Sequence, residues 1–492
     1  MNVMDRAFRE RCAVVPAHGL GLSVDVYSPD LSSLLGSLQR RQVLPAYLEV
    51  FQAAPAALAA VKQRAGDVPL TYHGEGIWLT RSDAIDDPVF SRDVSEVAGQ
   101  LRILNSAWSN HECATKQLAG YSFGTYLPPL YTPAGADVVA ANARYVQARL
   151  DREVVLPHGA SPLLLLEMPP LTYFSAGTIS IAEFFRCVTE QAPCGLVLDM
   201  GHLWTVYRYG GAWKRRGLAQ FVGEFLDAFP LERVIEMHVA GLAIHESDSA
   251  ESMPDRKGHR LPAWTDAHMA PIPPVLFDLL DQVLDHPRLT ALKGLALEVD
   301  TKPVDLIVEE FAIFQRRYGA VLPVQGAPVS TERAGPQLRV ADLPMCEPAV
   351  RNEVQAGYDR YARIVSGRMD PAGEEWTGPY ACLDELDRYR SVYLPHEILH
   401  WGGDVDAMFP ATCRELAARA VALSRFVSFW FHAPRAIAGA YDFFLIKIER
   451  FVEFVHDVAP ELDTVVSGEA EALRRAYAAA NEPVASTMQE VR

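Results

Sequence analysis

Residues 162–199, PLLLLEMPPLTYFSAGTISIAEFFRCVTEQAPCGLVLD, decide the fold of this chain. Two short apolar runs within it, Pro162–Glu167 and Gly195–Asp199, each end in a carboxylate. Between them, Ile181–Gln191 carries apolar residues at helical spacing. A strand, a helix and a second strand in this order form a β-α-β unit, whose parallel strands are buried on both faces. The stretch therefore predicts a parallel α/β fold with an acidic side chain at the end of each strand.

The same alternation continues on both sides of this unit. Further short apolar runs predict six more strands: Leu20–Val26, Ala46–Phe51, Val68–His73, Leu101–Ala107, Arg233–Val239 and Gly294–Val299. Helical stretches separate them, among them Ala54–Ala65, Ala136–Leu150, Leu218–Ala228 and Pro274–Val283. Eight strands that alternate with helices match a (β/α)8 TIM barrel in number.

The chain is long enough for a second unit beyond such a barrel. We expect the barrel to occupy residues 1–322 and a linker to occupy residues 323–345, which are rich in Pro, Gly and Ser and lack apolar periodicity. Residues 346–492 are predicted to form a smaller, predominantly α-helical domain. Its helical stretches are Cys346–Val365, Ala411–His432, Pro434–Val458 and Gly468–Asn481.

Composition narrows the possible partners. The net charge of −17 and the pI near 5.3 argue against binding to nucleic acid or to an anionic membrane, whose phosphates would be repelled. Seven cysteines without a CxxC pair fit a reducing compartment better than a disulfide framework. No apolar run reaches the ~18–20 residues of a membrane span. Met1–Cys12 contains several charged residues and lacks the apolar core of a signal peptide. We therefore expect a cytoplasmic protein.

Histidines and carboxylates recur at the ends of the predicted strands and in the loops that follow them. They are His73, His111, Glu167, Asp199, His238, Asp266, His268 and Glu298. In an eight-stranded barrel the carboxyl ends of all strands meet on one open face. Imidazoles and carboxylates gathered there are suitable ligands for a hard or borderline metal ion. The sequence therefore predicts a metalloenzyme.

Ten segments in the first two thirds of the chain resemble, in the same order, those of a known family. They are Gly19–Leu22, Leu48–Val50, Tyr72–Gly76, Ser109–Glu112, Leu127–Thr132, Leu165–Pro169, Cys194–Asp199, Met237–Gly241, Thr265–His268 and Leu297–Asp300. Cys194–Asp199, for example, is similar to the family's Cys-Gly-Leu-Leu-Leu-Asp. The family consists of TIM-barrel multinuclear iron enzymes that modify cysteines in ribosomal peptides. It includes the methanobactin oxazolone- and thioamide-forming enzyme and is domain-of-unknown-function family 692.

The resemblance implies a function and a set of site residues. It implies oxidative modification of a cysteine in a ribosomally synthesised precursor peptide, with two or three iron ions of mixed Fe(II)/Fe(III) state and dioxygen as co-substrate. The implied metal ligands are His73, His111, Glu167, Asp199, His202, His238, Asp266, His268 and Glu298. Six of them are also expected to be catalytic: His73, His111, Glu167, Asp199, His238 and Glu298. Glu49 and Asp300 are interpreted as supporting residues rather than ligands.

The chain departs from the family pattern at three places. Met168 replaces the asparagine that follows the strand-five glutamate, and His202 stands where an amide ligand is expected. Leu242 replaces a second histidine, with His245 three residues further on. These departures indicate a divergent member, and they affect the number of metal ions and the product more than metal binding itself.

Three other functions remain open on the sequence. A xylose-isomerase-like barrel with two divalent metals would act as an isomerase or hydrolase, and a degenerate barrel would only bind a peptide. The motif His396-Glu397-Ile398-Leu399-His400 fits the zinc-peptidase pattern HExxH. Gly402-Gly403 follows it directly, and Pro395 leaves about two helical turns for it. An interface or helix-capping role for this motif is therefore favoured over zinc binding.

The C-terminal unit is rich in aromatic residues, including Phe426, Phe429, Trp430, Phe431, Phe443 and Phe444. Relatives commonly work with a separate partner protein that captures the peptide leader. A tethered recognition unit would raise the effective concentration of the bound substrate and make that partner unnecessary. We therefore hypothesise that this unit binds the precursor peptide or replaces the partner protein, so that a barrel cut near Gly335 would bind the precursor poorly.

Overall fold

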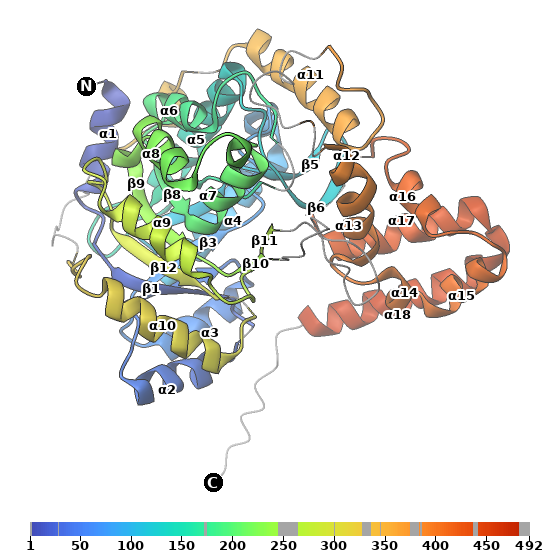
Figure 1. Cartoon of the computed structure of the whole chain (residues 1–492), viewed down its shortest axis with the longest axis horizontal. Helices are drawn as coiled ribbons and strands as arrows, with labels where there is room; N and C mark the ends of the chain where they lie inside the picture. The colour runs from blue at the N-terminus through green and yellow to red at the C-terminus, as the bar shows by residue number, and fades with distance from the viewer. Residues whose placement is uncertain are drawn as a thin grey trace.

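A closed barrel of eight parallel strands forms the first two thirds of the molecule (Figure 1). The computed structural model describes residues 2–27, 29–171, 175–244, 264–299, 301–326, 336–344, 346–373, 383, 386–435 and 441–481. Around the barrel the strands are β1 (Gly19–Val24), β12 (Gly294–Glu298), β9 (Val234–Val239), β8 (Gly195–Asp199), β7 (Leu163–Glu167), β4 (Trp108–Glu112), β3 (Leu70–Gly74) and β2 (Tyr47–Phe51). The predicted TIM-barrel fold class is confirmed.

Helices cover the outside of the barrel, as the alternation predicted. They are α1 (Val3–Cys12), α2 (Leu31–Arg41), α3 (Pro55–Ala65), α4 (Pro88–Leu104), α5 (Pro133–Glu153), α6 (Ile181–Gln191), α7 (Met200–Tyr209), α8 (Leu218–Ala228), α9 (Pro274–Leu284) and α10 (Val304–Tyr318). Two small antiparallel pairs extend from it: β5 (Thr115–Leu118) with β6 (Tyr121–Leu127), and β10 (Leu242–Ile244) with β11 (Trp264–Asp266).

The fourth strand is the one place where the predicted barrel was wrong. Leu101–Ala107 was expected to be a strand, but Leu101 and Leu104 continue the buried face of helix α4 at helical spacing. Asn105 then ends the helix in the left-handed conformation, with φ 57°. The strand is Trp108–Glu112 instead, so the histidine and the carboxylate of this segment lie within the strand rather than after it.

Alternation along each strand places every second side chain inside the barrel. On β7, Leu163 and Leu165 belong to the apolar interior cluster, and Glu167 is the next residue on the same face. On β2, Tyr47 reaches the interior, and Glu49 follows on that face. The barrel interior is therefore apolar toward the amino ends of the strands and polar toward their carboxyl ends.

The C-terminal residues form a helical unit that packs on one side of the barrel (Figure 1). Its helices are α11 (Pro348–Val365), α12 (Leu386–Arg388), α13 (Leu394–His400), α14 (Val405–Met408), α15 (Pro410–Ala418), α16 (Ser424–Trp430), α17 (Phe443–Val458) and α18 (Asp463–Asn481), with a π-helical turn at Tyr389–Tyr393. The single helix predicted over Ala411–His432 is wrong. Ala420 adopts a left-handed conformation, with φ 56°, and separates α15 from α16.

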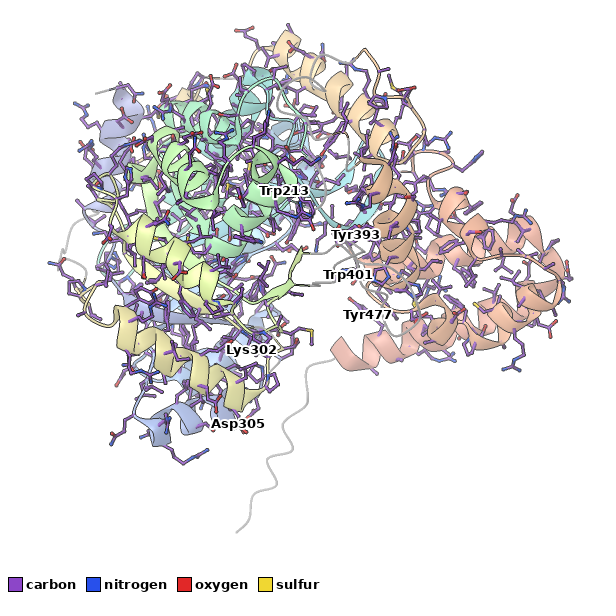
Figure 2. All side chains as sticks on the ribbon, in the orientation of Figure 1. Trp213, Lys302, Asp305, Tyr393, Trp401 and Tyr477 are labelled. Carbon is purple, nitrogen blue, oxygen red and sulfur yellow. The ribbon has the colours of Figure 1, made fainter. Side chains whose placement is uncertain are left out.

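This unit is joined to the barrel by packing and by hydrogen bonds. Helix α11 packs against α5, and α13 and α17 contact strand β6. Trp430 Nε1 donates to Ser122 O over 2.8 Å, and Tyr441 Oη donates to Phe123 O. Figure 2 shows Tyr393 and Trp401 on the side of the C-terminal helices that is turned toward the barrel. The β5–β6 hairpin is therefore held between the two units.

Part of the predicted linker also lies along the barrel. Leu338 N donates to Asp151 Oδ2 over 2.7 Å, and Arg144 Nη2 donates to Pro344 O over 3.1 Å. Both barrel residues belong to helix α5, so the chain follows this helix before it enters α11. None of the described helices is long and apolar enough to cross a membrane.

Candidate metal centre

Four strand-end side chains come together inside the mouth of the barrel. Glu49 of β2, His73 of β3, His238 of β9 and Glu298 of β12 each offer an atom that lies within 4.8 Å of the others. His238 Nε2 is 3.2 Å from Glu49 Oε1, and its Nδ1 is 3.3 Å from Glu298 Oε1. All four side chains are buried. Three of them were expected as ligands, whereas Glu49 was expected only in a supporting role.

Glu167, at the end of β7, links this group to the other side of the barrel. Its Oε1 lies 3.4 Å from His238 Nδ1, and its Oε2 lies 3.2 Å from His73 Nε2. Asn110 Nδ2 donates to Oε2 over 2.7 Å. The two carboxylate oxygens therefore face different imidazoles, an arrangement in which one carboxylate could bridge two metal ions.

Asp199 and His202 lie beside Glu167 at the start of helix α7. Asp199 Oδ1 accepts a hydrogen bond from His202 N over 2.7 Å and so caps the helix. His202 Nδ1 lies 3.5 Å from Glu167 Oε1 and 2.7 Å from Met168 O. The structure thus places His202 beside the group, with its Nδ1 at a backbone carbonyl and its Nε2 3.9 Å from Asp199 Oδ1.

The predicted residues near β11 are only partly described. His268 Nε2 lies 3.5 Å from Glu298 Oε2, so this histidine does reach the group. Asp266 ends strand β11, but its side chain lies outside the described part of the chain, as do His245 and Asp300.

His111 lies beside the group rather than within it. Its Nε2 is 3.1 Å from Ser109 Oγ, and its ring packs so closely on Gly74 that a Cβ there would lie 2.2 Å from His111 Cε1. Because side chains alternate along β4, Asn110 and Glu112 share the face that points to Glu167. The pKa of His111 is lowered to about 3 by burial and by the nearby His73.

The electrostatics of the group depend on a balance between burial and opposite charge. Burial lowers the pKa of His73, but Glu167 and Glu49 outweigh it and raise that pKa to about 9. The pKa of His238 is likewise raised well above its usual range, against burial, by Glu298, Glu49 and Glu167. Burial raises the pKa of Glu298 to about 8 and outweighs His238 and His268. The raised pKa values of His73, His238 and Glu298 therefore favour bound protons in this group when no cation is bound.

A metal ion fits these residues for two reasons. First, within the described residues no lysine or arginine pairs with Glu49, Glu167 or Glu298, although buried carboxylates need a cationic partner. Second, several buried atoms of the group form no aligned hydrogen bond to any described residue, among them both ring nitrogens of His238 and Oε1 of Glu167. Mixed imidazole and carboxylate donors suit iron, zinc or manganese.

A second polar layer lies one step deeper in the barrel, and its central residue, Glu236, was not among the residues predicted from the sequence. Glu236 accepts hydrogen bonds from Tyr47 Oη and Trp108 Nε1, each over 2.6 Å, and lies 3.7 Å from His238 Nε2. Ser23 Oγ donates to Glu49 Oε1 over 2.9 Å. The two-residue spacing of Glu236 and His238 on one strand was the available sign that both point inward.

The HExxH motif is not part of this centre. Glu397 lies on α13, where its Oε1 accepts from Gly124 N and its Oε2 accepts from Thr125 Oγ1 over 2.6 Å. Both carboxylate oxygens therefore bind strand β6. Gly402 and Gly403, with φ 63° and 117°, lie just beyond the end of the helix. The interface interpretation of this motif is confirmed for its glutamate.

Comparison with known proteins places the barrel in a family. The family model described as RiPP precursor modification enzyme MbnB/TglH/ChrH matches residues 18–316. A UPF0276 protein of Paraburkholderia phytofirmans is 30% identical over 199 residues, which cover 40% of this chain and 56% of that protein. A UPF0276 protein of Rhizobium meliloti is 24% identical over 232 residues, 46% of this chain and 63% of that protein. The chain thus spans less than two thirds of the length of these relatives.

Solved structures resemble the barrel more distantly. Endonuclease IV from Thermus thermophilus is 16% identical, with a TM-score of 0.35, and the match covers 62% of this chain and 98% of that one. A xylose isomerase domain protein from Planctomyces limnophilus is 9% identical, with a TM-score of 0.37 and the same coverage of both chains. The family model, by contrast, spans the barrel from β1 to α10, which is more than half of the 492 residues. The chain therefore belongs to the MbnB/TglH/ChrH family of RiPP precursor modification enzymes.

Proposed function

We propose that this protein catalyses the iron- and dioxygen-dependent oxidation of a cysteine in a ribosomally made precursor peptide. The observation that supports this most strongly is the buried group of Glu49, His73, Glu167, His238 and Glu298 at the mouth of a barrel of this family. Imidazole nitrogens and carboxylate oxygens in one enclosed site are the donors that non-haem iron takes in oxygen-using enzymes.

The ligands would be held by the ends of strands whose backbones the barrel fixes. His73, Glu167, His238 and Glu298 would bind the metal directly, with Glu49 as a further ligand and His202 and His268 at the edges of the site. Redox-active iron bound there would supply dioxygen activation and electron transfer from a bound thiolate. The family resemblance implies two or three such ions.

Neighbouring side chains orient the proposed ligands. Ser23 donates to Glu49, and Asn110 donates to Glu167, so that each carboxylate is held in one rotamer. The ring of Phe51 packs on His73 with centroids 4.4 Å apart. Burial of the whole group keeps bulk water away from it, which favours oxidation of the bound cysteine over loss of oxidant to solvent.

The test is mass spectrometry of a peptide after exposure to the iron-loaded protein. The protein would be co-expressed with short cysteine-containing reading frames that lie next to its gene, and each peptide would be examined for a change in mass at cysteine. A change that requires iron and dioxygen supports the proposal. No change with any such peptide, under conditions in which the protein is iron-loaded, contradicts it.

A further inference from the structure

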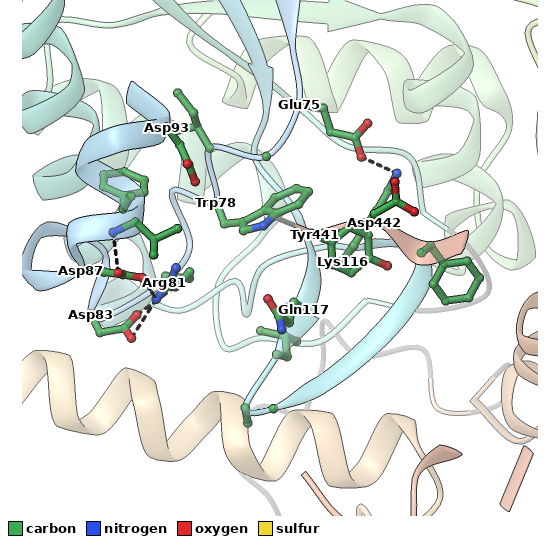
Figure 3. Close-up of a pocket in the computed structure, with 18 of the residues that line it drawn as sticks. Glu75, Trp78, Arg81, Asp83, Asp87, Asp93, Lys116, Gln117, Tyr441 and Asp442 are labelled. Carbon is green, nitrogen blue, oxygen red and sulfur yellow. Dashed lines mark hydrogen bonds and ion pairs between the residues drawn. The ribbon is translucent and has the colours of Figure 1, made fainter. Parts of the chain in front are cut away.

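A cleft of about 970 Å³ lies between the barrel and the C-terminal unit (Figure 3). The loop after β3 and the first turns of α4 form one side of it, and the β5–β6 hairpin forms another. Residues of the C-terminal unit complete it, namely Gln355 and Tyr358 of α11, Trp401-Gly402 after α13, Pro434-Arg435, and Tyr441–Phe443 at the start of α17. Without the C-terminal unit this cleft would be an open surface.

The cleft borders the candidate metal centre. Gln52 and Glu75 line it; Gln52 follows Phe51, which pairs with His73 across the sheet, and Glu75 is two residues after His73. Gln52 N donates to His73 O over 2.8 Å, and Glu75 N donates to Gln52 Oε1 over 3.0 Å. Two residues of the cleft lining are therefore connected by hydrogen bonds to the backbone of the strand that carries His73.

Aromatic side chains form the walls. The ring of Trp78 packs edge-on against Tyr441 in the cleft, with centroids 6.2 Å apart (Figure 3), and against Tyr126 behind it, with centroids 6.3 Å apart. Trp401, which also lines the cleft, is 51% exposed. Large exposed aromatic residues beside a concave site are typical anchors for a bound partner. Oε1 of Gln100, whose side chain is nine-tenths buried in the same wall, accepts no hydrogen bond from any described residue.

The charge of the cleft is acidic. Six carboxylates line it, Glu75, Asp83, Asp87, Asp93, Glu96 and Asp442, against the four cations Arg81, Arg92, Lys116 and Arg435. Each cation is covered by a carboxylate, as Lys116 is by Glu75 and Arg81 is by Asp83 and Asp87 (Figure 3). The acid is the more exposed partner in three of the cleft pairs, as for Asp83, whose side chain is 63% exposed against 28% for Arg81, but Asp87 and Asp93 are less exposed than their arginines. A ligand therefore meets the exposed carboxylates of Glu75, Asp83 and Glu96 in a cleft with two more acids than bases.

We infer that this cleft binds an extended, positively charged segment of the substrate peptide, with an aromatic or long aliphatic side chain against Trp401. The inference rests on the proposed function for the identity of the substrate. Its evidence is the surplus of carboxylates over cations in the lining, the exposed tryptophan, and the hydrogen bond that joins the lining residue Gln52 to the backbone of His73. The C-terminal unit thereby takes part in substrate recognition as a wall of the active-site entrance rather than as a separate tethered module.

The experiment uses a random dodecamer peptide library displayed on phage, panned against the full-length protein. Selected peptides are then synthesised with a fluorescent label, and their affinity is measured by anisotropy at low and high salt. Two surface variants in the cleft, Trp401→Ala and Glu96→Lys, are compared with Trp213→Ala and Glu309→Lys, which carry the same changes outside it. Metal content and circular dichroism are recorded for all variants.

The inference predicts enrichment of lysine, arginine and aromatic residues, with affinity that falls as salt rises. Trp401→Ala and Glu96→Lys should each weaken binding about 5- to 50-fold at unchanged metal content, while the two controls bind as the wild type does. Enrichment of acidic peptides, no enrichment, or equal binding by cleft and control variants would overturn it. Peptide binding is measured without turnover. The cleft variants can therefore bind peptide as the wild type does while cysteine oxidation is observed, which contradicts only the cleft, or the peptide can bind as expected while no oxidation occurs, which contradicts only the proposed function.

Discussion

Nε2 of His238 lies 3.2 Å from Oε1 of Glu49, inside the barrel and away from all solvent. The two residues come from strands that are not neighbours in the sheet, since β1 and β12 lie between β2 and β9. The side chains therefore meet across the barrel interior, where each lies against other ionisable groups. A cation between them would replace a buried proton, so metal binding at this group should be coupled to proton release.

Replacement of a strand-end ligand should remove the metal and leave the fold. Glu167, Asp199, His238 and Glu298 end central strands, and we expect alanine at any one of them to lower activity about 100-fold or more and to lower bound metal. The variants should remain soluble because the barrel hydrogen bonds that hold these strand ends are kept, and in the three carboxylate variants the change also removes like-charge repulsion. Metal content by mass spectrometry checks this, and full iron occupancy in all four variants would show that the ligand assignment is wrong.

Glu49 provides a sharper test, because the sequence indicated a supporting role and the structure brings it into the group. If it binds metal, Glu49→Gln should weaken metal affinity about 10- to 100-fold. Ser23→Ala, which removes only the hydrogen bond to Glu49, should have a smaller effect and serves as the control. Metal affinity is measured against a competing chelator. Equal metal affinities for Glu49→Gln and the wild type would show that Glu49 supports the site and is not a metal ligand.

Metal affinity should increase with pH. The pKa of His73 is about 9 in the metal-free group, against an ordinary 6.5, so its imidazole is protonated at neutral pH and must lose that proton to bind a metal. Apparent affinity should therefore rise up to about tenfold per pH unit for each displaced proton, and level off near pH 9. Calorimetry in two buffers of different ionisation enthalpy measures the proton release. A pH-independent affinity with no released proton would contradict this reading of the group.

The contact of Glu397 with β6 should make stability depend on pH. Burial raises the pKa of Glu397 to about 7, against the hydrogen bonds from Thr125 and Gly124. A carboxyl whose pKa is higher in the folded chain contributes its full stability below pH 4.5 and loses it as the pH rises to about 7. That loss is on the order of 3 kcal/mol.

Glu397→Gln removes this titration. Relative to the wild type, the variant should therefore gain stability between pH 4.5 and 7, as measured by denaturant unfolding at several pH values. Glu415→Gln, on an exposed glutamate paired with Arg419, should follow the wild type at every pH. If the free energies of unfolding of Glu397→Gln and the wild type changed in parallel with pH, ionisation of the Glu397 carboxyl would not destabilise the fold, and the prediction would be wrong.

Much of the barrel could be predicted because buried parallel strands are short, apolar and separated by helices. The misplaced fourth strand shows the limit: Leu101 and Leu104 satisfy a strand pattern and a helix pattern equally, and only packing on the barrel decides for the helix. Strand-end position indicated most of the group, but it does not reveal the direction of a side chain. For this reason Glu49 was expected only in a supporting role, Glu236 was not predicted, and His111 was placed in the group although Asn110 holds the inward position on β4.

The C-terminal unit could be predicted as helical, but its relation to the barrel could not. Its contacts depend on residues distant in sequence, such as Trp430 with Ser122 and Glu397 with Thr125. Because these contacts bind the β5–β6 hairpin, a chain cut near Gly335 would expose the hairpin as well as lose a recognition surface. Point variants in the cleft therefore test the role of this unit more cleanly than truncation does.

The measurement that tests the central claim most directly is metal analysis of anaerobically purified protein, combined with Mössbauer spectroscopy. The account predicts two or three iron ions per chain, with a spectrum of high-spin iron in nitrogen and oxygen coordination that changes when Glu167 or His238 is replaced. Zinc or manganese alone, with no oxidation of a cysteine peptide after iron loading, would contradict it.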